Sequence, residues 1–160
     1  MREISILVAV IVSAFVFGSI ASAAAYVPPG PGGEKTIGTI GGTVWLDSNA
    51  DGVQDPGERG MSGITVYLFN ATGGKVATTE TFSHACEGLY IFSGVSPGNY
   101  TVEVVPPEGY AFTVQGRGTP RDTVSTIDPI NGTAVINLTD ELVVETDLVV
   151  RDAGLVPVGN

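Results

Sequence analysis

The stretch TIGGTVWLDSNADGVQDPGERGMSGITVYLF, residues Thr39–Phe69, decides how this chain is expected to fold. Its first eight residues combine two glycines with β-branched and aromatic side chains, which favours a strand. Its last six residues alternate in polarity, so that Ile64, Val66 and Leu68 share one face of a second strand. An acidic loop, residues 47–58, joins the two predicted strands.

This acidic loop has the spacing of a calcium-binding loop. Oxygen-bearing side chains stand at alternate positions, a glycine follows at which the chain can turn sharply, and a glutamate closes the loop. The predicted ligands are Asp47, Asn49, Asp51, the carbonyl of Val53, Asp55 and Glu58, with Gly52 at the turn. Because Asp, Asn and Gly are also common turn residues, an ordinary polar turn is the alternative. An EF-hand loop lies between helices, whereas this loop lies between strands, so we expect Ca²⁺ to stabilise a β domain.

Short segments bounded by turn residues continue along the rest of the chain. They cover residues 75–82, 89–93, 99–105, 110–115, 123–127, 133–138 and 142–150. None of them has helical periodicity. Short strands at this spacing predict one β-sandwich or barrel.

The first 25 residues have the pattern of an export signal. Arg2 precedes the apolar run Ile4–Phe17, and Ala21-Ser22-Ala23 has the small-x-small form of a cleavage site. A cut is expected after Ala23 or within Ala24-Ala25. An uncleaved anchor is the alternative, because the uncharged N-terminal segment is long enough to span a bilayer. Both interpretations place the remaining chain outside the cytoplasm, as a secreted or cell-surface protein.

The sequence downstream divides by composition. Residues 26–36 are rich in proline and glycine and predict a linker. The folded domain is expected over residues 37–156, with a short tail at 157–160.

The net charge of −10 excludes the basic surface that nucleic-acid binding needs. It suits a solvated extracellular surface or one that gathers divalent cations. Four of the carboxylates lie in the acidic loop, where they would repel one another without a cation.

Cys86 is the only cysteine, so the chain has no internal disulfide to stabilise an exported domain. We expect a partly buried thiol, with an intermolecular disulfide as the alternative. His84 lies two residues earlier, but the pair lacks the third, orienting group of a nucleophilic site and is too small for a closed zinc site. No enzymatic activity is predicted.

Four Asn-x-Thr sequons are candidate glycosylation sites in an exported protein. Their asparagines are Asn70, Asn99, Asn131 and Asn137. Plain turn chemistry is the alternative explanation for these asparagines.

Residues 40–66 resemble the opening of a B-type domain of the SD-repeat surface proteins, called SdrD B-like, within the wider Cna-B group. Further similarity lies at residues 88–92, 97–102 and 107–110, and Asp152–Leu155 resembles the closing strand. The resemblance implies an all-β, immunoglobulin-like, prealbumin-type Greek-key sandwich. It also implies calcium binding by the side chains of the acidic loop, and a role as a rigid spacer or stalk.

Two departures from the family limit this expectation. Ser83–Glu87 stands where relatives often have acidic residues, and Val124–Asp128 stands where they often have alternating aspartates. Only the first calcium site is therefore predicted. Lys35 and Lys75 are not at the position where relatives form Lys–Asn isopeptide bonds, so none is predicted.

These patterns predict an exported, calcium-stabilised structural module of the cell surface, as an envelope or filament subunit or a spacer. An adhesin or carbohydrate-binding module is the alternative. The expected partners are other copies of the chain or other surface proteins, with membrane contact only through an uncleaved N-terminal segment.

Overall fold

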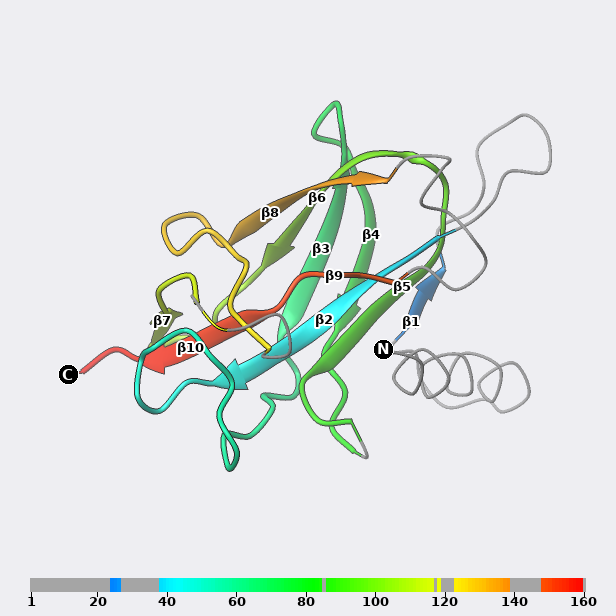
Figure 1. Ribbon diagram of the computed structural model, residues 1–160. Coiled ribbons are helices and arrows are strands. Elements are labelled where there is room, and N and C mark those ends of the chain that lie inside the picture. The colour runs from blue at the N-terminus through cyan, green and yellow to red at the C-terminus, as the bar shows by residue number, and fades with distance from the viewer. Residues whose placement is uncertain are drawn as a thin grey trace.

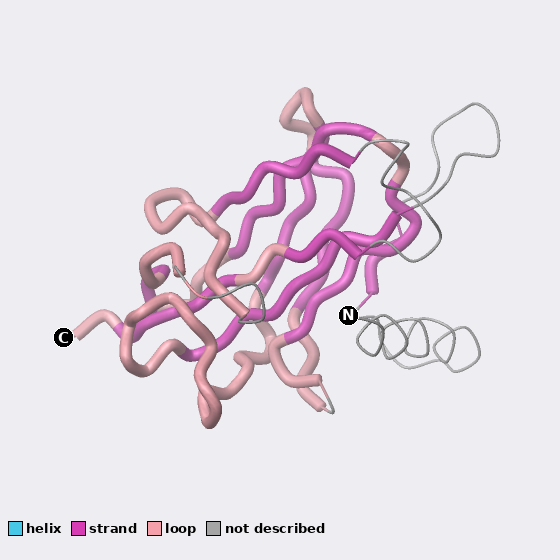
Figure 2. The backbone as a smooth tube through the Cα atoms, in the orientation of Figure 1, coloured by secondary structure: helices cyan, strands magenta, loops and turns pink. Residues whose placement is uncertain are grey.

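The computed structural model describes residues 24–26, 38–84, 86–116, 118, 123–138 and 148–159. Every regular element in these residues is a strand, and the strands form two sheets around one apolar core (Figure 1). Loops gather at the ends of the strands (Figure 2). The predicted all-β, immunoglobulin-like sandwich is thus confirmed.

Strand β2 is at the centre of the larger sheet, which has the order β1-β5-β2-β10-β7. Its strands are β1 (Ala24–Tyr26), β2 (Gly38–Leu46), β5 (Leu89–Val95), β7 (Tyr110–Phe112), β9 (Leu148–Val150) and β10 (Ala153–Pro157). Strand β2 pairs antiparallel with β5 and parallel with both β9 and β10.

The smaller sheet has the order β4-β3-β6-β8 and is antiparallel throughout. Its strands are β3 (Thr65–Asn70), β4 (Lys75–Glu80), β6 (Gly98–Val104) and β8 (Thr133–Leu138). Alternate residues of these strands point into the core, as the pattern at Val66 and Leu68 predicted, and both side chains are fully buried.

Trp45 at the end of β2 is also fully buried. It packs against Gly154, since a Cβ there would lie 2.9 Å from the indole Cζ2. The indole is therefore part of the packed interior and is not available to stack on a sugar.

Between β9 and β10, the buried carboxylate of Asp152 accepts a backbone N–H of β2, in the place where a backbone carbonyl would do so within a continuous strand. The Thr43 N–H donates to Asp152 Oδ1 at 2.7 Å, while the Tyr90 hydroxyl donates to the Arg151 carbonyl at 2.6 Å. Asp152 is 8% exposed, and its burial raises the pKa of the carboxyl to about 6, against the opposing effects of the Thr43 N–H and the Arg151 charge. Burial also raises the pKa of Tyr90.

The strand predicted at residues 123–127 is absent as a regular element, so that prediction was wrong. Only a single bridge, Val53↔Val124, forms there. The backbone bonds of this segment go to three different neighbours: Ser125 N donates to Gly52 O, Thr126 N donates to Asp152 O, and Ser125 O accepts from Gly116 N. A segment shared in this way has no continuous ladder with any one strand. The strand predicted at residues 110–115 is also shorter than expected and ends at Phe112.

Strand β1 lies along the outer edge of β5 in parallel register, with Ala25 opposite Phe92. Its residues were assigned by sequence to the end of the export signal and the start of the linker. A cut after Ala23 would leave the whole strand in the mature chain, whereas a cut within Ala24-Ala25 would shorten it. None of the described residues forms a helix long and apolar enough to cross a membrane. Residues 1–23 of the predicted signal, most of the linker, and residues 142–147 of the strand predicted at 142–150 lie outside the described residues.

Candidate functional site

Asp47 holds the acidic loop against the sandwich. It directly follows β2, is 1% exposed, and donates its N–H to the Leu155 carbonyl at 2.9 Å. Its carboxylate accepts from the backbone of the loop itself: Oδ1 from Ala50 N at 2.7 Å and Oδ2 from Gly52 N at 2.8 Å. Asp47, the first predicted ligand, thus holds the turn at residues 50–52 through its carboxylate.

Gly52 makes the sharp turn that the pattern required. Its φ is +80°, in the left-handed region that favours glycine. The loop also packs tightly here, because a Cβ on Gly52 would lie 2.7 Å from Gly116 N. Any side chain at this position would therefore displace the loop from residues 114–116.

Two carboxylates converge on one amide group above the turn. Asn49 Nδ2 donates to Asp51 Oδ2 at 3.1 Å and to Asp55 Oδ2 at 2.9 Å. Asp51 in addition accepts from Val53 N at 2.9 Å. The NH2 group of the amide, whose hydrogens carry partial positive charge, lies between the two negative groups.

Glu58 closes the loop through both of its oxygens. Oε1 accepts from Ser48 N at 2.6 Å and Oε2 accepts from Asp55 N at 3.1 Å. This carboxylate therefore ties the first residues of the loop to the last ones. Each oxygen keeps a further lone pair, so these bonds do not prevent coordination of an ion.

The backbone of Val53 faces the interior of the loop. The bonds that flank the Val53↔Val124 bridge are Gln54 N to Thr123 O at 2.8 Å and Ser125 N to Gly52 O at 2.8 Å. In an antiparallel pair of this type the residues between the bonds direct their own N–H and C=O away from the partner strand. The Val53 carbonyl therefore points to the loop side, as its predicted role requires.

The residues fit a calcium site in chemistry and chain path. They supply only oxygen ligands, the acceptors that Ca²⁺ prefers. Within the described residues, however, no three His, Cys, Asp or Glu side chains are close enough to hold a metal between them alone. An ion would need Asn49 and the Val53 carbonyl as well, with the Asn49 amide turned to present Oδ1 in place of Nδ2.

Sequence reasoning missed the support beneath the loop and the buried carboxylate of Asp152. The support comes from residues 114–116 and 123–125, far along the chain from the loop. The glycine at position 116 was the one signal of this support in the sequence. The structure explains it, because a Cβ there would approach the backbone of Gly52. For Asp152 the signal was a pair of charged residues, Arg151 and Asp152, inside the otherwise apolar run from Leu148 to Val156.

The sequon asparagines all lie on the smaller sheet or in its turns. Asn70 ends β3, Asn99 lies in β6, Asn137 lies in β8, and Asn131 precedes β8 by two residues. Two of them form local turns in which Oδ1 accepts from the threonine of the sequon: Thr72 Oγ1 at 2.8 Å for Asn70, and Thr133 Oγ1 at 2.6 Å for Asn131.

The His84 ring contacts the neighbouring Ser83. Ser83 Oγ lies 2.8 Å from His84 Nδ1, and Cys86 is a partly buried thiol, as expected. Lys75, at the start of β4, places its Nζ 4.2 Å from the centroid of the Tyr67 ring.

Known proteins resemble this chain over the folded domain. It is 38% identical over 112 residues to serine-aspartate repeat-containing protein F of Staphylococcus epidermidis, which covers 70% of this chain and 7% of that protein. It is 45% identical over 80 residues to serine-aspartate repeat-containing protein D of Staphylococcus aureus, covering 50% of this chain and 6% of that protein. The chain thus spans less than a tenth of either relative.

Among solved structures, the major pilin subunit BcpA of Bacillus cereus is similar with a TM-score of 0.45 and 17% identity, over 74% of this chain and 28% of that one. The minor pilin of Streptococcus agalactiae has a TM-score of 0.47 and 13% identity, over 79% of this chain and 47% of that one. The family model described as the SdrD B-like domain matches residues 38–155, from the start of β2 into β10. The chain therefore belongs to the family of SdrD B-like domains.

Proposed function

We propose that this chain is an exported structural module of the cell surface whose sandwich is stabilised by a calcium ion in the acidic loop. The observation that carries the proposal is the convergence of Asp51 and Asp55 on the amide of Asn49, next to the closing carboxylate of Glu58. Membership of the SdrD B-like family supports it.

The chemistry that Ca²⁺ would supply is positive charge and coordination for the crowded acidic side chains. The residues that would hold it are Asp47, Asn49, Asp51, the Val53 carbonyl, Asp55 and Glu58. Of these, Asp47 and Glu58 already fix the loop through backbone bonds, whereas Asp51 and Asp55 face each other across a neutral amide. The ion would therefore stabilise the arrangement of Asp51 and Asp55 more than that of Asp47 and Glu58.

Removal of calcium should lower the melting temperature. An ion at one hundred times its dissociation constant stabilises a fold by about 2.7 kcal/mol. For a domain of this size that corresponds to a shift of roughly 10 °C. The measurement is a thermal melt followed by circular dichroism with Ca²⁺, with EDTA, and with EDTA followed by excess Ca²⁺. Identical melts, with no calcium in the purified protein by elemental analysis, would overturn the proposal.

Asp51→Asn separates calcium binding from the stability of the loop itself. The amide keeps an acceptor for Val53 N, loses the exposed bond from Asn49 Nδ2 and removes one negative charge, so we expect the melt in EDTA to change little. The calcium-dependent shift should fall to a small fraction of that of the wild type. Asp128→Asn is the matched control, because this aspartate also caps a turn, at Ile130 N, but lies outside the loop. A full calcium shift in Asp51→Asn would remove Asp51 from the ligand set.

Export would also expose the four sequons to glycosylation. Asn99, Asn131 and Asn137 are exposed, and Asn70 is half-buried at the end of β3. The proposed function therefore includes N-linked glycans on this module, checked by glycopeptide mass spectrometry of the protein from the organism that encodes it.

A further inference from the structure

The four sequons are placed on one side of the sandwich only. All four asparagines belong to β3, β6, β8 or the turn that leads into β8, which are parts of the smaller sheet. No strand of the larger sheet contains a sequon asparagine. Glycans on Asn99 and Asn137 would therefore cover the outer face of the smaller sheet.

Two of these asparagines are direct neighbours. In the register of β6 and β8, Asn99 lies opposite Asn137, and both side chains are exposed on the outer face of the sheet. Cβ atoms of such a cross-strand pair are about 5 Å apart. A branched sugar on one Nδ2 would cover the other, so the paired strands have room for one glycan.

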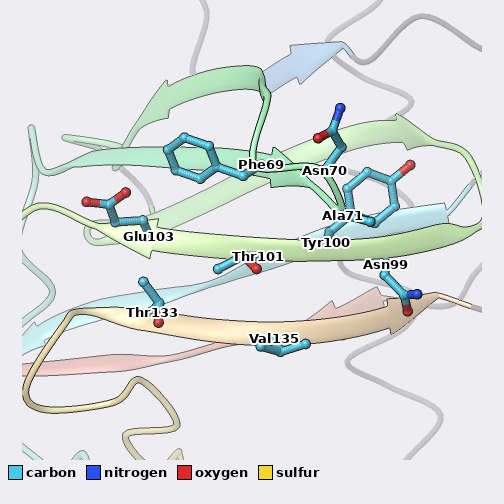
Figure 3. Close-up of a pocket in the computed structure, with 10 residues that line it drawn as sticks. Phe69, Asn70, Ala71, Asn99, Tyr100, Thr101, Glu103, Thr133 and Val135 are labelled. Carbon is cyan, nitrogen blue, oxygen red and sulfur yellow. The ribbon is translucent and has the colours of Figure 1, made fainter.

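A groove begins beside this pair. It has a volume of about 600 Å³ and runs over β6, between β3 on one side and β8 on the other (Figure 3). Asn99 lies at one end of it, Phe69 and Val135 lie on its two sides, and Thr101 lies between them. Val135 is 72% exposed, so its apolar side chain is open to contact from the groove.

The lining of the groove suits a sugar. A pyranose ring presents apolar C–H groups, which can pack on Phe69 and Val135, and hydroxyls, which can bond to Thr101 and to Glu103 at the far end. A glycan that starts at Asn99 reaches this lining without crossing another element, because Asn99 is itself part of the groove.

We propose, on the basis of the glycosylation proposed above, that Asn99 carries a glycan whose first sugars lie in this groove, and that Asn137 is unmodified in the same molecule. In the transfer, Nδ2 of Asn99 forms a bond to the anomeric carbon of a sugar-pyrophosphate donor. The bond from that carbon to the pyrophosphate oxygen breaks, and Nδ2 loses one proton. Asn99 is the residue that carries the glycan because Asn99 lines the groove, whereas Asn137 does not.

Site occupancy tests the exclusion of Asn137. In glycopeptides of the protein from its own organism, Asn99 should be modified and Asn137 should not. In Asn99→Gln, modification should appear at Asn137, whereas the control Asn70→Gln should leave Asn137 bare. Intact masses that show glycans on both residues of one molecule, or an unmodified Asn137 in Asn99→Gln, would overturn the exclusion while leaving glycosylation itself in place. Absence of glycans from all four asparagines would instead remove the proposed glycosylation and this inference with it.

Hydroxyl-radical footprinting tests the position of the glycan. Phe69 should be oxidised several-fold more in Asn99→Gln/Asn137→Gln than in the wild type, because its ring would lose its cover. Asn131→Gln is the control, since that asparagine does not line the groove. Equal oxidation of Phe69 in the wild type and the double variant would show that the glycan points away from the groove.

Discussion

Replacement of Gly42 by alanine should destabilise the sandwich by about 3 kcal/mol or more, or prevent folding. Gly42 lies in the middle of β2, and a Cβ on it would meet the carbonyl of Arg151, with the carbonyl carbon at 2.6 Å. Backbone atoms cannot rotate aside as a side chain can. The Arg151 carbonyl is also held in place, because it accepts the hydroxyl of Tyr90. The substitution should therefore separate β2 from the turn between β9 and β10.

Gly98→Ala is the matched control in the smaller sheet. The nearest neighbour of a Cβ there is Tyr100 Cε2 at 3.4 Å, an ordinary contact, so the change in stability should stay within about 1 kcal/mol. Urea unfolding of both variants, followed by circular dichroism, measures the difference. Equal stability of the two variants would mean that the approach of Gly42 to Arg151 is looser than the structure shows.

Asp152→Asn should change how stability depends on pH. The pKa of Asp152 is about 6 in the fold, against an ordinary value of 3.8, so the folded state binds more protons between these two values. The stability contributed by this group is therefore fully present below pH 4 and is lost as pH rises through 6. The loss amounts to about 3 kcal/mol at 1.36 kcal/mol per pKa unit. Asparagine keeps an acceptor for Thr43 N and has no charge to lose.

The measured quantity is the difference in unfolding free energy between Asp152→Asn and the wild type. It should move by about 3 kcal/mol in favour of the variant between pH 3 and pH 7.5. Working in EDTA keeps the acidic loop free of metal in both proteins, so that its carboxylates titrate alike and cancel. If the unfolding free energies of the variant and the wild type changed with pH in the same way, the pKa of Asp152 would not be raised in the fold.

Local patterns predicted those parts of the fold that depend on neighbours in sequence. The alternation at Val66 and Leu68 specified the buried face of β3, and the spacing from Asp47 to Glu58 specified a loop that closes on itself. Both features depend on side-chain direction and turn chemistry over a few residues.

The remaining features depend on partners that are distant in the chain. Residues 123–127 have β-forming composition, yet their hydrogen bonds are divided among segments near Gly52, Gly116 and Asp152. Asp152 is buried because Thr43, 109 residues away, needs an acceptor. The pairing of Asn99 with Asn137 follows from the register of β6 and β8, which composition does not specify.

The parallel pairing of β2 with β9 and β10 determines how the domain would respond to a mechanical pull. Strand β2 begins at Gly38 and β10, the last described strand, ends at Pro157, and because the two strands run the same way these points lie at opposite ends of β2. They are about 30 Å apart, at about 3.3 Å for each residue of a strand. Tension between these points acts along the strands. The hydrogen bonds that join β2 to β9 and β10 are then loaded together in shear, and they do not break one after another. A module built in this way would transmit force along its length before it unfolds.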